Sequence, residues 1–184
     1  MLFVYIQFTD WADLPEITGP AIPYNHLSSE ETEPYMVRGK TPDRKADIRA
    51  AKKWPDARSC LIRSELKQKY PDLRKINWRK MRMDTDIEVC MFRIFNSLGT
   101  PELNKHWFMK QGLSPDIVNV HNEYVQTWVS VQGTRKSPKL GGSLVPPKGI
   151  RSLVLGSISW SESFSASWDK TGKLISVSHS FTYE

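Results

Sequence analysis

The sequence predicts an α+β fold, in which N-terminal helices pack on one face of a curved antiparallel sheet that ends in a long C-terminal hairpin. Two observations predict this class. Segments with helix start and stop signals occupy most of residues 41–112, and strict alternation of apolar and polar side chains runs through residues 150–184. Such alternation is typical of strands with one covered face and one open face.

The C-terminal hairpin is predicted to have an apolar face and a serine face. The outgoing strand has a serine at every odd position from 157 to 167, and its even positions are Ile158, Trp160, Glu162, Phe164, Ala166 and Trp168. The return strand repeats the pattern with Ile175, Val177, His179, Phe181 and Tyr183. A turn of two or four residues keeps the apolar faces opposite each other. We therefore expect three pairs: Trp168 with Ile175, Ala166 with Val177, and Phe164 with His179.

Four helices are predicted from their caps and prolines. The first covers residues 41–53 and the second covers residues 54–70, each with a proline at its start. The third, residues 84–98, has acidic residues in its first turn and a glycine after its last. The fourth covers residues 100–112, and strand character resumes over residues 117–131.

Charge is segregated along the chain. Residues 1–37 carry six acidic side chains and no Lys or Arg, whereas residues 38–82 carry sixteen Lys or Arg against five acids. We interpret the first segment as a strand followed by an acidic, proline-rich arm, and the second as a basic helical segment. Residues 84–184 form the α+β core, and all three segments belong to one domain. The arm either lies across the basic segment or is a solvated linker.

Composition favours an intracellular protein in a reducing compartment, either the cytoplasm or an organelle matrix. Cys60 and Cys90 lie in helix-like stretches without metal-ligand spacing, so buried free thiols are favoured over a disulfide. No apolar run approaches the roughly 20 residues of a membrane span, and no signal-peptide pattern opens the sequence. The histidines stand in unrelated stretches, so we expect no metal and no cofactor.

Part of the sequence resembles a known superfamily. A run of helices, a long bent strand ending in SWDKTGKLISVSHSF and aromatic side chains on one face resemble the cone-shaped superfamily of nuclear transport factor 2-like and ketosteroid isomerase-like proteins. The resemblance covers residues 84–184 and is one of pattern. It implies a pocket between helices and sheet, in a superfamily that includes isomerases, dehydratases, small-ligand binders and subunits without chemistry. None of its catalytic signatures maps onto specific positions here.

Aromatic and ionisable residues of this half give the candidate pocket. Its aromatic candidates are Trp107, Tyr124, Trp128, Trp160, Phe164 and Phe181, and the alternative is that they form the core. Glu162 and His179 are the ionisable residues within the apolar faces of the hairpin, and the expected register makes them diagonal neighbours. They form either an acid and base pair facing a ligand, or a pair that only satisfies itself.

The basic segment gives the candidate binding surface. Its cations are Arg49, Lys52, Lys53, Arg74, Lys75, Arg79, Lys80 and Arg82, with Trp54, Tyr70 and Trp78 interleaved. They meet an acidic protein partner, the phosphates and bases of a nucleic acid, or only water.

Three functions follow from these sites. The favoured one is a non-enzymatic binding or assembly subunit, which holds partners through the basic helices and the acidic arm. The alternatives are a small-molecule binder or enzyme of isomerase or dehydratase type, and an RNA- or DNA-binding protein. The serine face of the sheet is small and flat. Either water covers it or another sheet packs closely on it, and we favour the second, in a homodimer.

Overall fold

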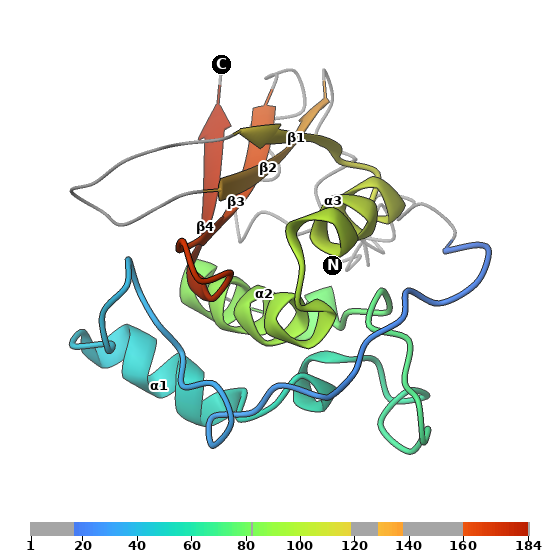
Figure 1. Cartoon of the computed structure of the whole chain (residues 1–184), viewed down its shortest axis with the longest axis horizontal. Coiled ribbons are helices and arrows are strands. Elements are labelled where there is room, and N and C mark those ends of the chain that lie inside the picture. The colour runs from blue at the N-terminus through green and yellow to red at the C-terminus, as the bar shows by residue number, and fades with distance from the viewer. Residues whose placement is uncertain (1–16, 82, 119–128, 138–159, 184) are drawn as a thin grey trace, which may run out of the picture.

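The computed structural model describes residues 17–81, 83–118, 129–137 and 160–183. Helices precede strands within these ranges, which confirms the α+β class (Figure 1). The described elements are α1 (Lys45–Lys53), the short 3-10 turns η1 (Arg58–Cys60) and η2 (Trp78–Lys80), α2 (Asp84–Leu98), α3 (Pro101–Lys110), β1 (Ser114–Val118), β2 (Val129–Ser137), β3 (Trp160–Trp168) and β4 (Leu174–Tyr183).

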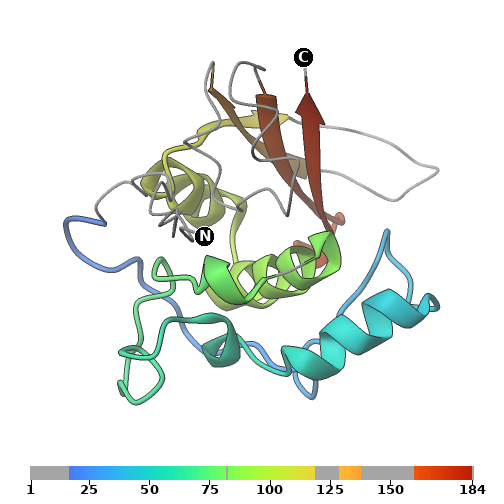
Figure 2. The ribbon, with the colours of Figure 1, turned by 180° about the vertical axis from the view of Figure 1, so that it is seen from behind.

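The strands form one antiparallel sheet in the order β1-β2-β3-β4. Helices cover one of its faces, with α3 against β1 and β2, and α2 against β4. Helix α1 packs on α2 and lies in the layer farthest from the sheet (Figures 1 and 2). The predicted arrangement of helices on one face of the sheet is therefore confirmed.

Helix α2 is the centre of the molecule. Acidic residues occupy its first turn, and Gly99 ends it with a φ of 80°, a left-handed conformation that favours glycine. Its buried residues include Ile87, Val89, Phe92 and Phe95, which face in several directions around the helix. A helix that is apolar on more than one side is typical of a position between layers.

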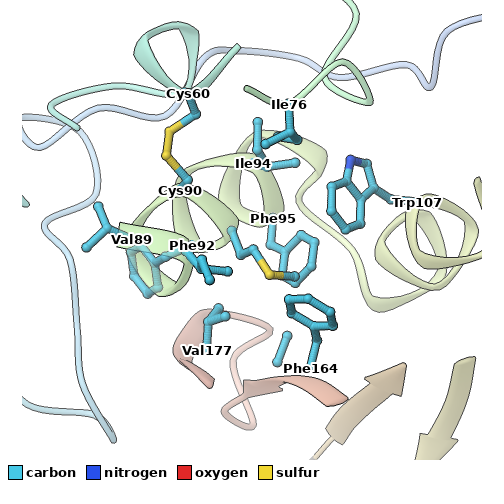
Figure 3. Close-up of a cluster of buried hydrophobic side chains, with 14 of the residues drawn as sticks. Cys60, Ile76, Val89, Cys90, Phe92, Ile94, Phe95, Trp107, Phe164 and Val177 are labelled. Carbon is cyan, nitrogen blue, oxygen red and sulfur yellow. A yellow bond between two sulfur atoms is a disulfide. The ribbon is translucent and has the colours of Figure 1, made fainter. Parts of the chain in front are cut away.

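Aromatic rings join α2 and α3 to the sheet. The rings of Phe95 and Phe108 lie 5.1 Å apart between centroids, and Phe108 lies 6.3 Å from Phe164 on β3 (Figure 3 shows Phe95 and Phe164). Gly133 on β2 allows this packing, because a Cβ atom there would lie 2.8 Å from Cδ1 of Phe108. Trp107 is fully buried in the same cluster and donates its indole N–H to the carbonyl of Leu73 (3.0 Å).

The predicted helix over residues 54–70 is wrong. Only η1 is helical in this stretch, and the chain then forms a loop closed by an antiparallel bridge between Leu61 and Ile76. Arg58 donates to the carbonyls of Leu66 and Gln68, at 3.2 Å and 2.6 Å, which a helix would use internally. Contacts made in the folded protein override the helix propensity of the sequence here. Helix α1 also begins later than predicted, at Lys45.

The prediction of two free thiols is wrong as well. Cys60 and Cys90 form a disulfide, with their Cα atoms 5.6 Å apart (Figure 3). Cys60 is the last residue of η1 and Cys90 lies on α2, so the bridge joins η1 to α2. The expectation of a reducing compartment was based on two free thiols, so the disulfide removes that basis.

The described part of the acidic arm, residues 17–37, docks on the core and is therefore not a solvated linker. The Arg93 side chain of α2 is completely buried, and its guanidinium contacts the carbonyls of Ser29 and Glu33 and the carboxylate of Glu30. The N–H of Ser28 donates to the hydroxyl of Ser97 on α2 (2.9 Å). Arg93 of α2 is thus one cation that holds the arm. Arg74 of the basic segment is another, because it donates to the carbonyls of Thr18 and Gly19 at 3.0 Å each. The apolar run over residues 1–8 lies outside the described residues.

The hairpin register is confirmed except at its turn. Ala166 pairs with Val177 and Phe164 with His179, as expected, but Trp168 pairs with Leu174. The difference is a bulge, in which Ile175 is the extra residue on β4. Its carbonyl accepts the N–H of Gly39 (3.0 Å), so the bulge attaches the hairpin to the turn before α1.

None of the helices within the described ranges is long and apolar enough to cross a membrane.

Reducing the Cys60–Cys90 disulfide should lower the free energy of unfolding by about 3 kcal/mol, because the bridge links residues 30 positions apart and restricts the unfolded chain. Urea unfolding with and without dithiothreitol measures the loss. The variant with both Cys60→Ala and Cys90→Ala is the control, and its midpoint should not respond to dithiothreitol. Two titratable thiols in the denatured, unreduced protein would contradict the bridge.

Candidate functional sites: the His179 cluster and the basic face of α1

His179 lies between two carboxylates at the joint of helices and sheet. Its Nε2 is 3.1 Å from Oε1 of Glu162 on β3, and its Nδ1 is 3.2 Å from Oδ1 of Asp84 on α2. The diagonal contact between Glu162 and His179 agrees with the expected register. Asp84 was not predicted, because the spacing of residues along α2 does not reveal which strand they meet. The three side chains form the His179 cluster.

Both ring nitrogens of His179 face carboxylate oxygens, which accept hydrogen bonds, so both nitrogens donate and the ring is an imidazolium. Burial lowers the pKa of His179, but the hydrogen bonds and negative charges of Asp84 and Glu162 outweigh it and raise the pKa to about 9. His179 is therefore a permanent cation at neutral pH.

A third carboxylate borders the cluster. Oε1 of Glu88, one turn after Asp84, accepts the backbone N–H of His179 (3.3 Å). Burial raises the pKa of Glu88, and the charges of Asp47 on α1 and of Asp84 raise it further. The hydroxyl of Tyr35 is buried near Glu88 and Asp47 and has no hydrogen-bond partner among the described atoms. The joint is thus rich in carboxylates, and His179 is the cation that balances them from the sheet.

Two members of the His179 cluster are buried and the third is open to solvent. Glu162 is completely buried and His179 is 9% exposed, whereas the side chain of Asp84 is 76% exposed. The buried pair holds β3, β4 and α2 together but has no access to a substrate. The alternative in which the pair satisfies itself is the one this geometry favours.

The candidate aromatic pocket is not assembled by the residues that the structure describes. Trp107 and Phe164 are packed in the core. Tyr124 and Trp128 lie outside the described residues, and only the backbone of Trp160 and Phe181 is described, in β3 and β4.

The serine face carries paired hydroxyls. Ser163 and Ser180 lie 2.7 Å apart between their oxygens, as do Ser165 and Ser178. Together with Gln132 they line a shallow depression of about 200 Å³. The homodimer expected through this face stays a prediction.

Several candidate cations of the basic segment are structural. Arg74 is 3% exposed and is bound to the carboxylate of Asp72 and to two carbonyls of the N-terminal arm, so its prediction as a binding residue is wrong. Lys75 pairs with Glu65 (2.8 Å). Lys53 pairs with a buried carboxylate of α2 (2.9 Å). Arg74 is thus buried with its partners, whereas the side chains of Lys53 and Lys75 are 43% and 39% exposed beside theirs.

Helix α1 presents the cations that remain available. Lys45, Arg49 and Lys52 are exposed, and none of them has an ion pair with a described residue. Their spacing places them on one side of the helix. Ile48 lies between them and is 39% exposed. We call these four residues the basic face of α1.

Two further candidates of the segment are exposed. Arg79 and Lys80 both lie in η2, and Arg82 lies outside the described residues. Of the interleaved aromatic residues, Trp54 and Trp78 are each 3% exposed, so only Tyr70 remains on the surface.

No family model, curated protein or solved structure matches the chain. The resemblance to the nuclear transport factor 2-like superfamily therefore stays a prediction. Within the described ranges, no group of three or more His, Cys, Asp or Glu residues is arranged to hold a metal ion.

Stability should fall as the pH rises from about 6.5 to 9. The pKa of His179 is higher in the folded protein than in the unfolded chain, so its contribution is complete below about 6.5 and is lost as the pH passes 9. The loss should be up to roughly 3 kcal/mol, measured by urea unfolding across this range.

The matched variants are His179→Gln and Glu162→Gln. His179→Gln should remove most of this pH dependence, and Glu162→Gln should reduce it. A free energy of unfolding that is constant or rising between these pH values would mean that His179 is neutral in the folded protein.

Proposed function

We propose that the protein is a non-enzymatic binding subunit that holds an acidic protein partner on the basic face of α1. The observation that carries this proposal is the division of the cations. Buried cations such as Arg74 and Arg93 are paired with carboxylates, whereas Lys45, Arg49 and Lys52 are exposed without such a pair among the described residues. Exposed cations of one sign attract a partner of opposite charge and steer its approach.

A protein partner fits this face better than a single-stranded nucleic acid. Recognition of single strands depends on aromatic platforms beside the cations. Trp54 and Trp78 are buried, so they supply no such platform near α1. The half-exposed Ile48 between the cations instead favours a partner with both acidic and apolar side chains.

Two carboxylates of the acidic arm act within the protein. Glu30 contacts Arg93, and Glu33 lies 2.8 Å from His26. The buried pair of Glu162 and His179 likewise gives the small-molecule alternative no supporting observation.

Reversing Lys45→Glu and Lys52→Glu together should weaken binding of poly-L-glutamate about tenfold, since each exposed ion pair contributes roughly 0.5–1 kcal/mol and reversal adds repulsion. The affinity of the unchanged protein should also fall with salt between about 50 and 200 mM. Fluorescence anisotropy of labelled poly-L-glutamate measures both effects.

The matched control reverses Lys170→Glu and Lys173→Glu, two exposed lysines of the turn between β3 and β4. It makes the same change in net charge and should leave binding within about twofold. Equal losses in both variants would show a response to net charge alone. Tighter binding of a single-stranded oligonucleotide than of poly-L-glutamate would replace the protein partner with a nucleic acid.

A further inference from the structure

Residues 62–75 form a loop whose two ends are paired. Leu61 and Ile76 make an antiparallel bridge, and the N–H of Ile62 donates to the carbonyl of Lys75 (3.0 Å). Because the ends meet, a short turn would suffice to connect them. A compact loop of this length with adjacent ends is an Ω-loop, a class that is frequently functional.

The loop is held from inside by side chains. Glu65 is 5% exposed, accepts a backbone N–H of the returning limb (3.0 Å) and pairs with Lys75 (2.8 Å). Arg58 binds two carbonyls of the outer part of the loop, at 3.2 Å and 2.6 Å. The Cys60–Cys90 disulfide fixes the adjoining stem to α2. Ordering a loop opposes folding by about 1–2 kcal/mol per residue, so these contacts offset a substantial loss of entropy.

Residues 63–70 form the tip of the loop, which is exposed. Every residue of this tip except Glu65 is exposed. Tyr70 is 75% exposed and Leu66 is 36% exposed. The cations of the tip are Arg63, Lys67 and Lys69. The tip therefore combines an aromatic ring, an aliphatic side chain and three positive charges on an ordered backbone.

We infer that this tip is a second contact surface for the acidic protein partner, with Tyr70 and Leu66 as its apolar anchors. The inference rests on the proposed function, because it assigns one partner to both surfaces. Helix α1 and the loop lie at the two ends of the layer farthest from the sheet (Figures 1 and 2). A partner that crosses this layer meets cations at both ends and an aromatic anchor at one.

The composition of the tip favours a protein over a nucleic acid. Tyrosine, with arginine, is among the residues that contribute most to protein interfaces, where cations form the rim. The ammonium group of Lys69 lies 5.2 Å from the centre of the Tyr70 ring, so one face of the ring is already occupied by a cation. Leu66 offers no stacking surface to a base.

The test compares two polymers, poly-L-glutamate and a random copolymer of glutamate and tyrosine. The unsubstituted protein should bind the copolymer more tightly than poly-L-glutamate, because only the copolymer offers apolar groups to the tip. Tyr70→Ala should weaken binding of the copolymer about tenfold and leave poly-L-glutamate within about twofold. Leu66→Ala should have a smaller effect in the same direction, because Leu66 is less exposed than Tyr70. This substitution keeps the contact of Arg58 with the loop, since Arg58 binds the backbone carbonyl of Leu66.

Met109→Ala is the matched control, because Met109 is 57% exposed on α3, outside both surfaces. It should leave both affinities unchanged. The inference would be overturned if the Tyr70→Ala variant bound the copolymer as tightly as the unsubstituted protein does. In that case the proposed function still stands if reversal of Lys45 and Lys52 weakens binding of poly-L-glutamate. A Tyr70-dependent affinity for oligo(dT) that exceeds the affinity for the copolymer would overturn the choice of a protein partner.

Discussion

Burial of α2 on several sides is the constraint on which the rest of the structure depends. A helix between layers must satisfy every polar group it carries, since an unpaired buried charge is strongly destabilising. Several polar residues of α2 do so by holding other segments, although the buried Nδ2 of Asn96 has no hydrogen-bond partner among the described atoms. Arg93 holds the N-terminal arm, Asp86 accepts the indole N–H of Trp54 (3.0 Å), and Asp84 contacts His179 of the hairpin. Cys90 binds the loop stem. The helix thus determines the positions of four segments that are distant in sequence.

The same constraint sorts the charges of the chain into two groups. Cations that approach α2 or the returning limb of the loop are paired, as Arg74 is with Asp72. Cations that point away from the core, on α1 and on the tip of the loop, are left to solvent or a partner. The sixteen Lys or Arg of one segment are therefore divided. Some form structural ion pairs, and others are exposed on α1, in η2 and on the tip of the loop.

The predictable parts of this fold are those set by local pattern. Acidic residues and Gly99 place α2 at the predicted residues, and alternation places Glu162 and His179 on one face of the hairpin. The loop after residue 61 was not predictable in this way, because its conformation depends on Arg58, Glu65 and the disulfide, which act across the folded chain. The roles of Arg93 and Asp84 were not predicted for the same reason. A single sequence shows that a buried helix carries charged residues, but it does not show what each of them meets.

Both proposed contact surfaces are ordered before any partner binds. The basic face lies on a helix whose buried side packs through Ala50 and Ala51, and the tip is held by Arg58 and Glu65. A partner therefore need not break an internal ion pair of Lys45, Arg49 or Lys52, nor order the backbone around Tyr70. Binding then loses little conformational entropy, which is the main way in which preorganised surfaces gain affinity. The internal contacts of the loop keep the ring of Tyr70 exposed to solvent, and under the proposed function this exposure makes the ring accessible to the partner.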